Sequence, residues 1–344
     1  MLKKISLIAG IFLVVLIAFV AEKIQFLPFW PFSMGFPAKH PIEPVLIVIL
    51  LGILINNVIK VPKIFDEGVE FCGKKLLPIA IILLGARLHF QDMLAVSVSA
   101  ILISVACIVI TFIITIWLCQ RANIDKALSI LIAMGTAICG SAAILVAAPV
   151  ITASKKNIAI AITVINLFGL IAIFLFPLLG HLLNMTDTAF GLWAGTSIQA
   201  VPQAVAASFA FGEQAGAIGT ITKLMRVLFL APMIIALSFW QNRKFSDGEK
   251  AVSAVSWKSY IPPFILGFIA LIIINSFGWL PVTTTVWLTK LSSFLLTMAL
   301  AAIGLKVNLL HLIKGGLKPL VIAGLSALIL AFVSWILIQA FIVV

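Results

Sequence analysis

Two basic side chains, Lys223 and Arg226, lie within the apolar run ITKLMRVLFLAP. Residues three apart share one face of a helix, so both cations are expected on the same side of a membrane-spanning segment. No carboxylate is near them in the sequence, and a charge in hydrocarbon is costly enough that it persists for a function or with a partner. The pair therefore suits either binding of an anionic substrate or pairing with the carbonyl ends of helices.

Small residues crowd a second apolar stretch, 133–151, which reads AMGTAICGSAAILVAAPVI. A weaker match, GTSI against GTAI, marks a similar stretch at 188–212. Interrupted helices line substrate sites in transporters, and a broken helix offers unpaired N–H groups and a positive dipole end to an anion. Close helix packing is the alternative explanation for small residues. Pro149 and Pro202 beside these stretches favour a site.

The predicted anion site combines small residues at the breaks with hydrogen-bonding or charged groups beside them. Its members are Gly135, Thr136, Cys139, Gly140, Ser141, Gly195, Thr196, Ser197, Gln199, Gln203, Lys223 and Arg226. Cys139 has no histidine nearby to activate it, so it is expected to pack rather than to act as a nucleophile. Arg87 and Lys306 are expected either to supply charge support or to extend toward an interface.

Other chemistries are disfavoured. All eleven acidic residues fall in loops or at helix ends, which argues against a carboxylate-centred cation antiporter. The four cysteines are scattered and indicate neither a disulfide framework nor a metal site. The sequence has no phosphate-cradling glycine motif and no nucleophile–base pair, so we expect neither ATP-driven pumping nor an enzyme, and no cofactor. Whether Na⁺ or H⁺ is a coupling ion stays open.

The composition indicates an all-α polytopic membrane protein in contact with the lipid bilayer. Of 344 residues, 63% are hydrophobic and 10% are charged, and apolar runs of helix-spanning length recur along the chain. The net charge of +12 is expected to reflect Lys and Arg kept in cytoplasmic loops, not nucleic-acid binding. The first run is expected to be an uncleaved helix and not a signal peptide.

About ten or eleven membrane segments are expected within a single transmembrane domain, 1–344. It would comprise a first helix and outer loop (1–40), a first half (41–183) and a second half (188–344). The expected helices are 5–21, 44–59, 76–88, 94–118, 157–183, 218–240, 261–277, 287–304 and 319–343, with interrupted segments at 127–151 and 188–212. Asn56, Asn166 and Asn275 lie in apolar runs and are expected to form interhelical hydrogen bonds.

An internal duplication is visible in the sequence. PVLIVILLGILINN, starting at Pro44, resembles PFILGFIALIIINS, starting at Pro263. Continued without a gap, the same register places Gly85 on Gly304 and Arg87 on Lys306. Several coincidences in one register indicate repeats.

The positive-inside rule favours a topology in which both interrupted segments enter and leave on the same side. If 127–151 crossed the membrane once, Lys155 and Lys156 would lie outside; if it re-enters, they are cytoplasmic. With the second segment re-entering from the outer face, the repeats become inverted, as in many secondary transporters. The order of segments in the two halves does not match a simple tandem repeat.

Several motifs resemble a known bacterial family. They are GTAICGSAAI followed by APVI, ILLGARLHFQDMLAV, TKLMRVLFLAP and IGLKVNLLHLIKGGLKPL. Together they resemble UPF0324, the YeiH-like membrane proteins often labelled sulfate exporters. The resemblance implies an inner-membrane location and inverted repeats like those of bile-acid symporters and the NhaA antiporter.

The resemblance also implies interrupted helices that cross near the midplane, so crossing helices and re-entrant hairpins both stay open. A homodimer is implied only by analogy with superfamily relatives. Many family members carry a histidine and an acidic residue where this chain has Gln199 and Ala200. Proton coupling through that position is therefore not expected here.

The leading functional hypothesis is a secondary transporter that moves a small anion, sulfur-containing or otherwise inorganic, by alternating access. The alternatives are a channel-like anion pathway and a Na⁺-coupled transporter of a small organic solute. On the sequence alone, replacing Lys223 or Arg226 by alanine is expected to impair transport without loss of folded protein.

Overall fold

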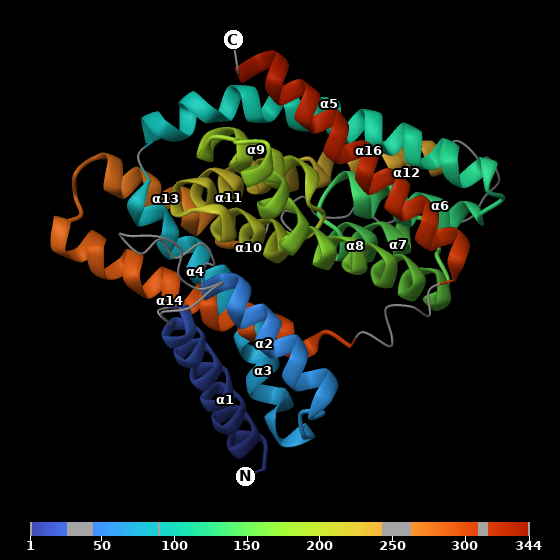
Figure 1. The fold of residues 1–344 in the computed structure, drawn as a ribbon. Helices are drawn as coiled ribbons and strands as arrows, with labels where there is room; N and C mark the ends of the chain where they lie inside the picture. The colour runs from blue at the N-terminus through green and yellow to red at the C-terminus, as the bar shows by residue number, and fades with distance from the viewer. Residues whose placement is uncertain (1, 26–43, 89, 243–262, 309–315, 343–344) are drawn as a thin grey trace. The chain divides into compact units, whose positions relative to one another are not determined.

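The computed structural model describes residues 2–25, 44–88, 90–242, 263–308 and 316–342, and within these ranges all regular structure is helical (Figure 1). Among the described helices, six are long and apolar enough to cross a membrane. They are Ile5–Ile24, Ala100–Arg121, Lys155–Leu182, Glu213–Trp240, Val282–Lys306 and Leu317–Phe341. Most of the predicted outer loop, up to residue 40, falls outside the described ranges. An all-α polytopic membrane protein is thus confirmed.

The observed helices follow the predicted apolar runs, with one notable difference. The segment expected at 218–240 begins earlier, at Glu213, and is divided into α11 (Glu213–Leu228) and α12 (Leu230–Asn242). Pro232 lies in the first turn of α12 and has no N–H to donate to a preceding carbonyl. This missing donor accounts for the interruption of the helix near Phe229.

The contacts of the chain divide it into two compact units, each drawn from separate stretches. The first unit comprises Met1–Leu94, Phe209–Ala217 and Pro263–Leu309. Its helices are α1 (Leu2–Gln25), α2 (Pro44–Val58), α3 (Asp66–Phe71), the π-helix Cys72–Leu76, α4 (Leu77–Leu84), the short 3₁₀ turn Gly85–Arg87, α13 (Pro263–Ser276) and α14 (Val282–Lys306).

The two sequence-similar stretches make reciprocal hydrogen bonds within the first unit. Asn56 Nδ2 donates to the carbonyl oxygen of Val307 at 3.1 Å. At the equivalent position of the other stretch, Asn275 Nδ2 donates to the carbonyl oxygen of Leu88, also at 3.1 Å. The predicted bonding role of these two asparagines is confirmed, and each ties its own stretch to the end of the other.

Two aligned glycines allow equally reciprocal close packing. A Cβ atom on Gly85 would lie 2.6 Å from the carbonyl oxygen of Phe268, and one on Gly304 would lie 2.6 Å from that of Ile49. Such distances are too short for any side chain. Glycine is therefore required at both positions because helix backbones meet there.

The two cations predicted to give charge support have carboxylate partners in the first unit. Arg87 Nη1 lies 2.7 Å from Glu213 Oε2, and Lys306 Nζ lies 3.3 Å from Glu70 Oε2. Glu70 also pairs with Lys74, and hydrogen bonds from Lys74 and Lys306 lower the pKa of the Glu70 carboxyl. Both cations are thus part of partly exposed ion pairs, which contribute little to stability.

The second unit comprises Ala95–Ser208, Ile218–Pro262 and Leu310–Val344. It contains most of α5 (Phe90–Arg121), then α6 (Lys126–Ala137), α7 (Ser141–Val150), α8 (Lys155–Leu182), α9 (Asp187–Ser197), most of α10 (Val201–Phe211) and of α11, then α12 and α16 (Leu317–Ile342). All predicted site residues except the two supporting cations belong to this unit.

The first interrupted segment is a helical hairpin made of α6 and α7. Asp125 caps the start of α6 by accepting from the N–H of Leu128 at 3.1 Å. The same carboxylate accepts from Asn157 Nδ2, in the first turn of α8, at 2.7 Å. The beginning of α6 and the chain that follows α7 therefore lie side by side, so the segment returns to the side from which it entered.

The second interrupted segment, α9 and α10, turns back in the same way. A Cβ atom on Gly219 of α11 would meet the Ser208 side chain, near the end of α10, and the carbonyl oxygen of Gly191, near the start of α9. The two arms of this segment thus contact the same residue of α11, so α10 runs back along α9. Both interrupted segments are thus helical hairpins in the structure, and the membrane face from which each one enters stays a prediction.

Candidate functional site between two hairpin tips

The tips of the two hairpins lie against each other. Gly140, which precedes α7, has a φ of +70°, a conformation that residues with a side chain rarely adopt. A Cβ atom placed on it would lie 3.3 Å from the backbone and side chain of Ala200, between α9 and α10. The sequence therefore has glycine at the point where the first tip both reverses direction and touches the second.

Gly140→Ala is expected to destabilise the protein by about 1–3 kcal/mol from backbone strain and to cost more because of the Ala200 contact. Gly278→Ala is a matched control, since Gly278 also has a φ of +70° but a Cβ atom added there would meet nothing within 4 Å. Thermal unfolding of both variants in detergent measures the difference. Equal losses of stability would contradict a tight contact between the tips.

Lys223 joins the two breaks. Its side chain has no exposed surface, and Nζ donates to the carbonyl oxygens of Ile138 at 2.9 Å and Ile198 at 2.6 Å. These carbonyls directly follow the last residues of α6 and α9, where helix carbonyls lack an intrahelical donor. One ammonium group on α11 thus satisfies an orphan acceptor at each hairpin tip.

Arg226 binds the same two helix ends one turn further along α11. Its buried guanidinium donates through Nε to the carbonyl oxygen of Ala137 at 2.8 Å and through Nη2 to that of Thr136 at 2.6 Å. Nη1 donates to the carbonyl oxygen of Thr196. Of the two roles that the sequence left open for the cations, pairing with carbonyl ends is the one observed.

The similar sequences GTAI and GTSI make the same hydrogen bonds at the ends of α6 and α9. In each hairpin the threonine hydroxyl donates to the carbonyl four residues earlier, Thr136 to Ile132 and Thr196 to Leu192. In each, the threonine carbonyl accepts from Arg226 and the isoleucine carbonyl accepts from Lys223. A four-residue similarity that proves little by itself thus marks two equivalent positions in the fold.

Asn166, midway along α8, contacts the outgoing arm of both hairpins. Ser141 Oγ, at the start of α7, donates to Asn166 Oδ1 at 2.9 Å. Gln203 Nε2, in the first turn of α10, donates to the carbonyl oxygen of Asn166 at 3.1 Å. The predicted interhelical hydrogen bonding of Asn166 is confirmed. These two bonds place Asn166 beside the first turns of α7 and α10.

A small cavity reaches the tip of the second hairpin. Its volume is about 160 Å³, and it is bounded mainly by apolar side chains of α8 and α16. Ser197 and Gln199 are its two polar lining residues, and each is only 2% exposed. Ser197 Oγ and Gln199 Oε1 form no hydrogen bond with the protein groups that the structure describes. Buried polar atoms normally have partners, so these two are available to a bound solute or to water.

The tips carry net positive charge. With both side chains protonated, Lys223 and Arg226 bring two unit charges, which the carboxyl-terminal dipole ends of α6 and α9 reduce by about one. The amino-terminal ends of α7 and α10 add back about one. The balance is about +2 elementary charges, and in the part of the chain that the structure describes no carboxylate forms an ion pair with Lys223 or Arg226. This balance favours an anion near the tips even though the cations themselves bind carbonyls.

Sequence comparisons identify the protein's relatives. Residues 9–323 match the family model described as conserved hypothetical protein 698. A UPF0324 membrane protein of Bradyrhizobium diazoefficiens, blr3189, is 34% identical over 337 residues, which are 98% of this chain and 94% of the relative. This chain belongs to the UPF0324 family. Further UPF0324 relatives are a Clostridium tetani membrane protein, 35% identical over 84% of this chain and 86% of the relative, and the inner-membrane protein YeiH of Escherichia coli K12, 36% identical over 86% and 84%.

The UPF0324 relatives and the apolar helices together indicate a multi-pass protein of the inner membrane. No solved structure is significantly similar to this chain. The architecture of this UPF0324 protein is therefore described from its own contacts.

The sequence predicts most of the residues at the hairpin tips. It does not predict that Asn166 and Ser334 contact them. The sequence marks Asn166 only as a polar residue in an apolar run, and its contact with both hairpins depends on the fold. Ser334 of α16, whose hydroxyl contacts that of Thr196, has no distinguishing sequence signal. Cys139 is 3% exposed and lies between the tip residues, in keeping with its expected packing role.

Proposed function

We propose that this protein is a secondary transporter that carries a small anion, sulfur-containing or otherwise inorganic, across the inner membrane by alternating access. The observation that carries the proposal is the meeting of two hairpin tips around a buried, positively charged centre. Interrupted helices at membrane depth occur where backbone lines a cavity or is covered by protein, and transporters use them as substrate sites.

The substrate is expected beside the amino-terminal ends of α7 and α10, not on the two cations. The first-turn N–H groups of a helix have no intrahelical acceptor and point toward an approaching anion. Ser141, Ser197, Gln199 and Gln203 supply neutral groups near these ends. Lys223 and Arg226 hold the half-helices together and provide the long-range positive potential.

The proposal is tested with the full-length protein reconstituted in liposomes. Counterflow and thermal stabilisation are measured across sulfate, sulfite, thiosulfate, taurine, bicarbonate and small carboxylates. A substrate present at a hundred times its Kd stabilises the folded protein by about 2.7 kcal/mol. An anion that both stabilises and exchanges supports a carrier, whereas flux without counterflow indicates a channel. Folded protein that responds to none of these anions would overturn the proposed substrate class.

A further inference from the structure

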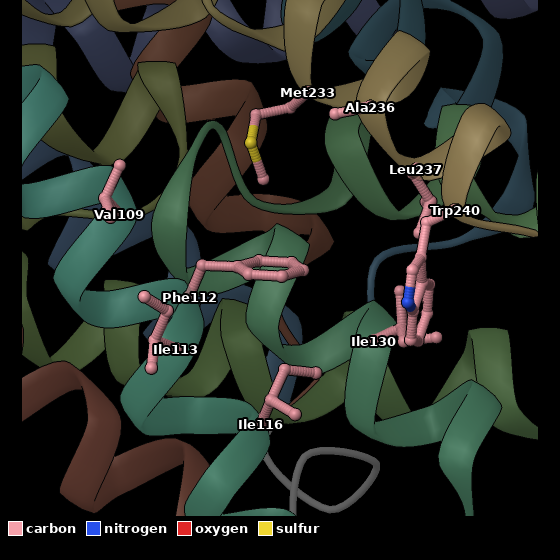
Figure 2. A pocket seen from close by; sticks show the side chains of 9 residues that line it. All are labelled: Val109, Phe112, Ile113, Ile116, Ile130, Met233, Ala236, Leu237 and Trp240. Carbon is pink, nitrogen blue, oxygen red and sulfur yellow. The ribbon is translucent and has the colours of Figure 1, made fainter.

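A second cavity lies at an exposed apolar surface of the second unit, and none of the hairpin-tip residues lines it. It has a volume of about 380 Å³, within the range of small-molecule sites, and apolar residues line it throughout. Figure 2 shows these side chains converging from three helices: Val109, Phe112, Ile113 and Ile116 of α5, Ile130 of α6, and Met233, Ala236, Leu237 and Trp240 of α12. We call this cavity the α5–α12 groove.

One end of the groove is marked by aromatic and basic residues. Trp240 lines the groove, and Lys126 Nζ lies over its ring at 4.7 Å from the centroid. On α5, the guanidinium of Arg121 lies 5.3 Å from the centroid of the Trp117 ring. Cation–π contacts of this kind hold both basic heads at a defined place beside the groove.

The limits of the apolar spans indicate a membrane interface at this basic end. The apolar spans of α5 and of α11–α12 end at Arg121 and at Trp240. Tryptophan and basic residues gather where hydrocarbon meets headgroups. Asp125, next to Lys126 in the sequence, accepts hydrogen bonds from Leu128 and Asn157. The groove therefore joins an apolar trough to a rim that carries the basic side chains of Arg121 and Lys126.

We propose that the α5–α12 groove binds one anionic glycerophospholipid of the inner leaflet, with an acyl chain in the trough and the phosphate at Arg121 and Lys126. Charge complementarity selects this occupant: a zwitterionic lipid offers the same chain but no net charge to the two cations. Ile113, 61% exposed, and Trp240, 44% exposed, leave the trough open to the surrounding membrane, so a lipid enters without unfolding the helices.

The test uses native mass spectrometry of the full-length protein in detergent with equal amounts of phosphatidylglycerol and phosphatidylethanolamine of identical chains. The wild type is expected to retain phosphatidylglycerol preferentially. Arg121→Ala and Lys126→Ala should each reduce that preference roughly fivefold. Lys75→Ala removes an exposed cation of the first unit and should leave the preference unchanged.

A second pair of variants tests the trough itself. Ala236→Trp and Ile113→Trp place a large side chain into the groove from exposed positions, so folding is expected to persist and is checked by size-exclusion chromatography. Both should lower retention of either lipid. A wild type without preference for phosphatidylglycerol, or undiminished retention in both blocked variants, would overturn the proposal.

Discussion

Arg226→Ala is expected to destabilise the folded protein by about 3 kcal/mol or more. The substitution leaves the carbonyl oxygens of Thr136, Ala137 and Thr196 buried without this donor, and each unsatisfied buried acceptor costs about 1–3 kcal/mol. The hydrogen bonds therefore replace the expectation drawn from the sequence, that alanine here would spare the fold, with a predicted loss of stability. Thermal and chemical unfolding in detergent measure the loss.

Two comparison variants separate the role of the guanidinium from that of a charge. Arg87→Ala removes a partly exposed arginine from its ion pair with Glu213 and should cost no more than about 1 kcal/mol. Arg226→Lys keeps the charge but cannot reproduce the forked donor geometry, so it should fall between wild type and Arg226→Ala. Equal stability of the Arg226→Ala and Arg87→Ala proteins would show that the carbonyl contacts contribute little.

Lys223→Gln is expected to weaken anion transport roughly thirtyfold while leaving more folded protein than Arg226→Ala. Glutamine keeps a donor for one tip carbonyl but removes a unit charge. At about 8 Å from a bound anion and an effective dielectric constant of 20, that charge contributes about 2 kcal/mol, which corresponds to the stated factor. The concentration dependence of sulfate counterflow, or of whichever anion exchanges, measures the change.

Lys306→Gln provides the matched control, because it removes a charge that already pairs with Glu70 in the first unit. Its half-saturating anion concentration should equal that of the wild type. Lys223→Arg, which keeps the charge, should recover most of the affinity if it folds. An unchanged half-saturating concentration in Lys223→Gln would remove the electrostatic role assigned to this lysine.

The helices and their interruptions could be predicted from the sequence because both are local properties. Apolar runs of membrane length form helices wherever water is excluded, and glycine or proline at their centres breaks them. Gly140 illustrates this: its positive φ is a property of one residue, and the surrounding GTAICGSA pattern predicts a break.

The asparagines show where local reasoning stops. Asn56 and Asn275 are expected to bond between helices, since an amide in hydrocarbon needs a partner. Which partner each takes, Val307 or Leu88, depends on helices far apart in the chain. The reciprocity of these bonds becomes visible only when both copies of the similar stretch are folded against each other.

A polytopic membrane protein with two broken segments and two cations on one helical face follows from the amino-acid sequence alone. Composition, periodicity and charge placement carry that information because each acts on neighbouring residues or on the whole chain. That the breaks are hairpin tips, and that Lys223 and Arg226 bind their carbonyl ends, follows only from the folded arrangement. The physical reason is that a buried cation takes the acceptors that folding brings within about 3 Å, and those acceptors are main-chain oxygens, which every residue possesses and no sequence pattern distinguishes.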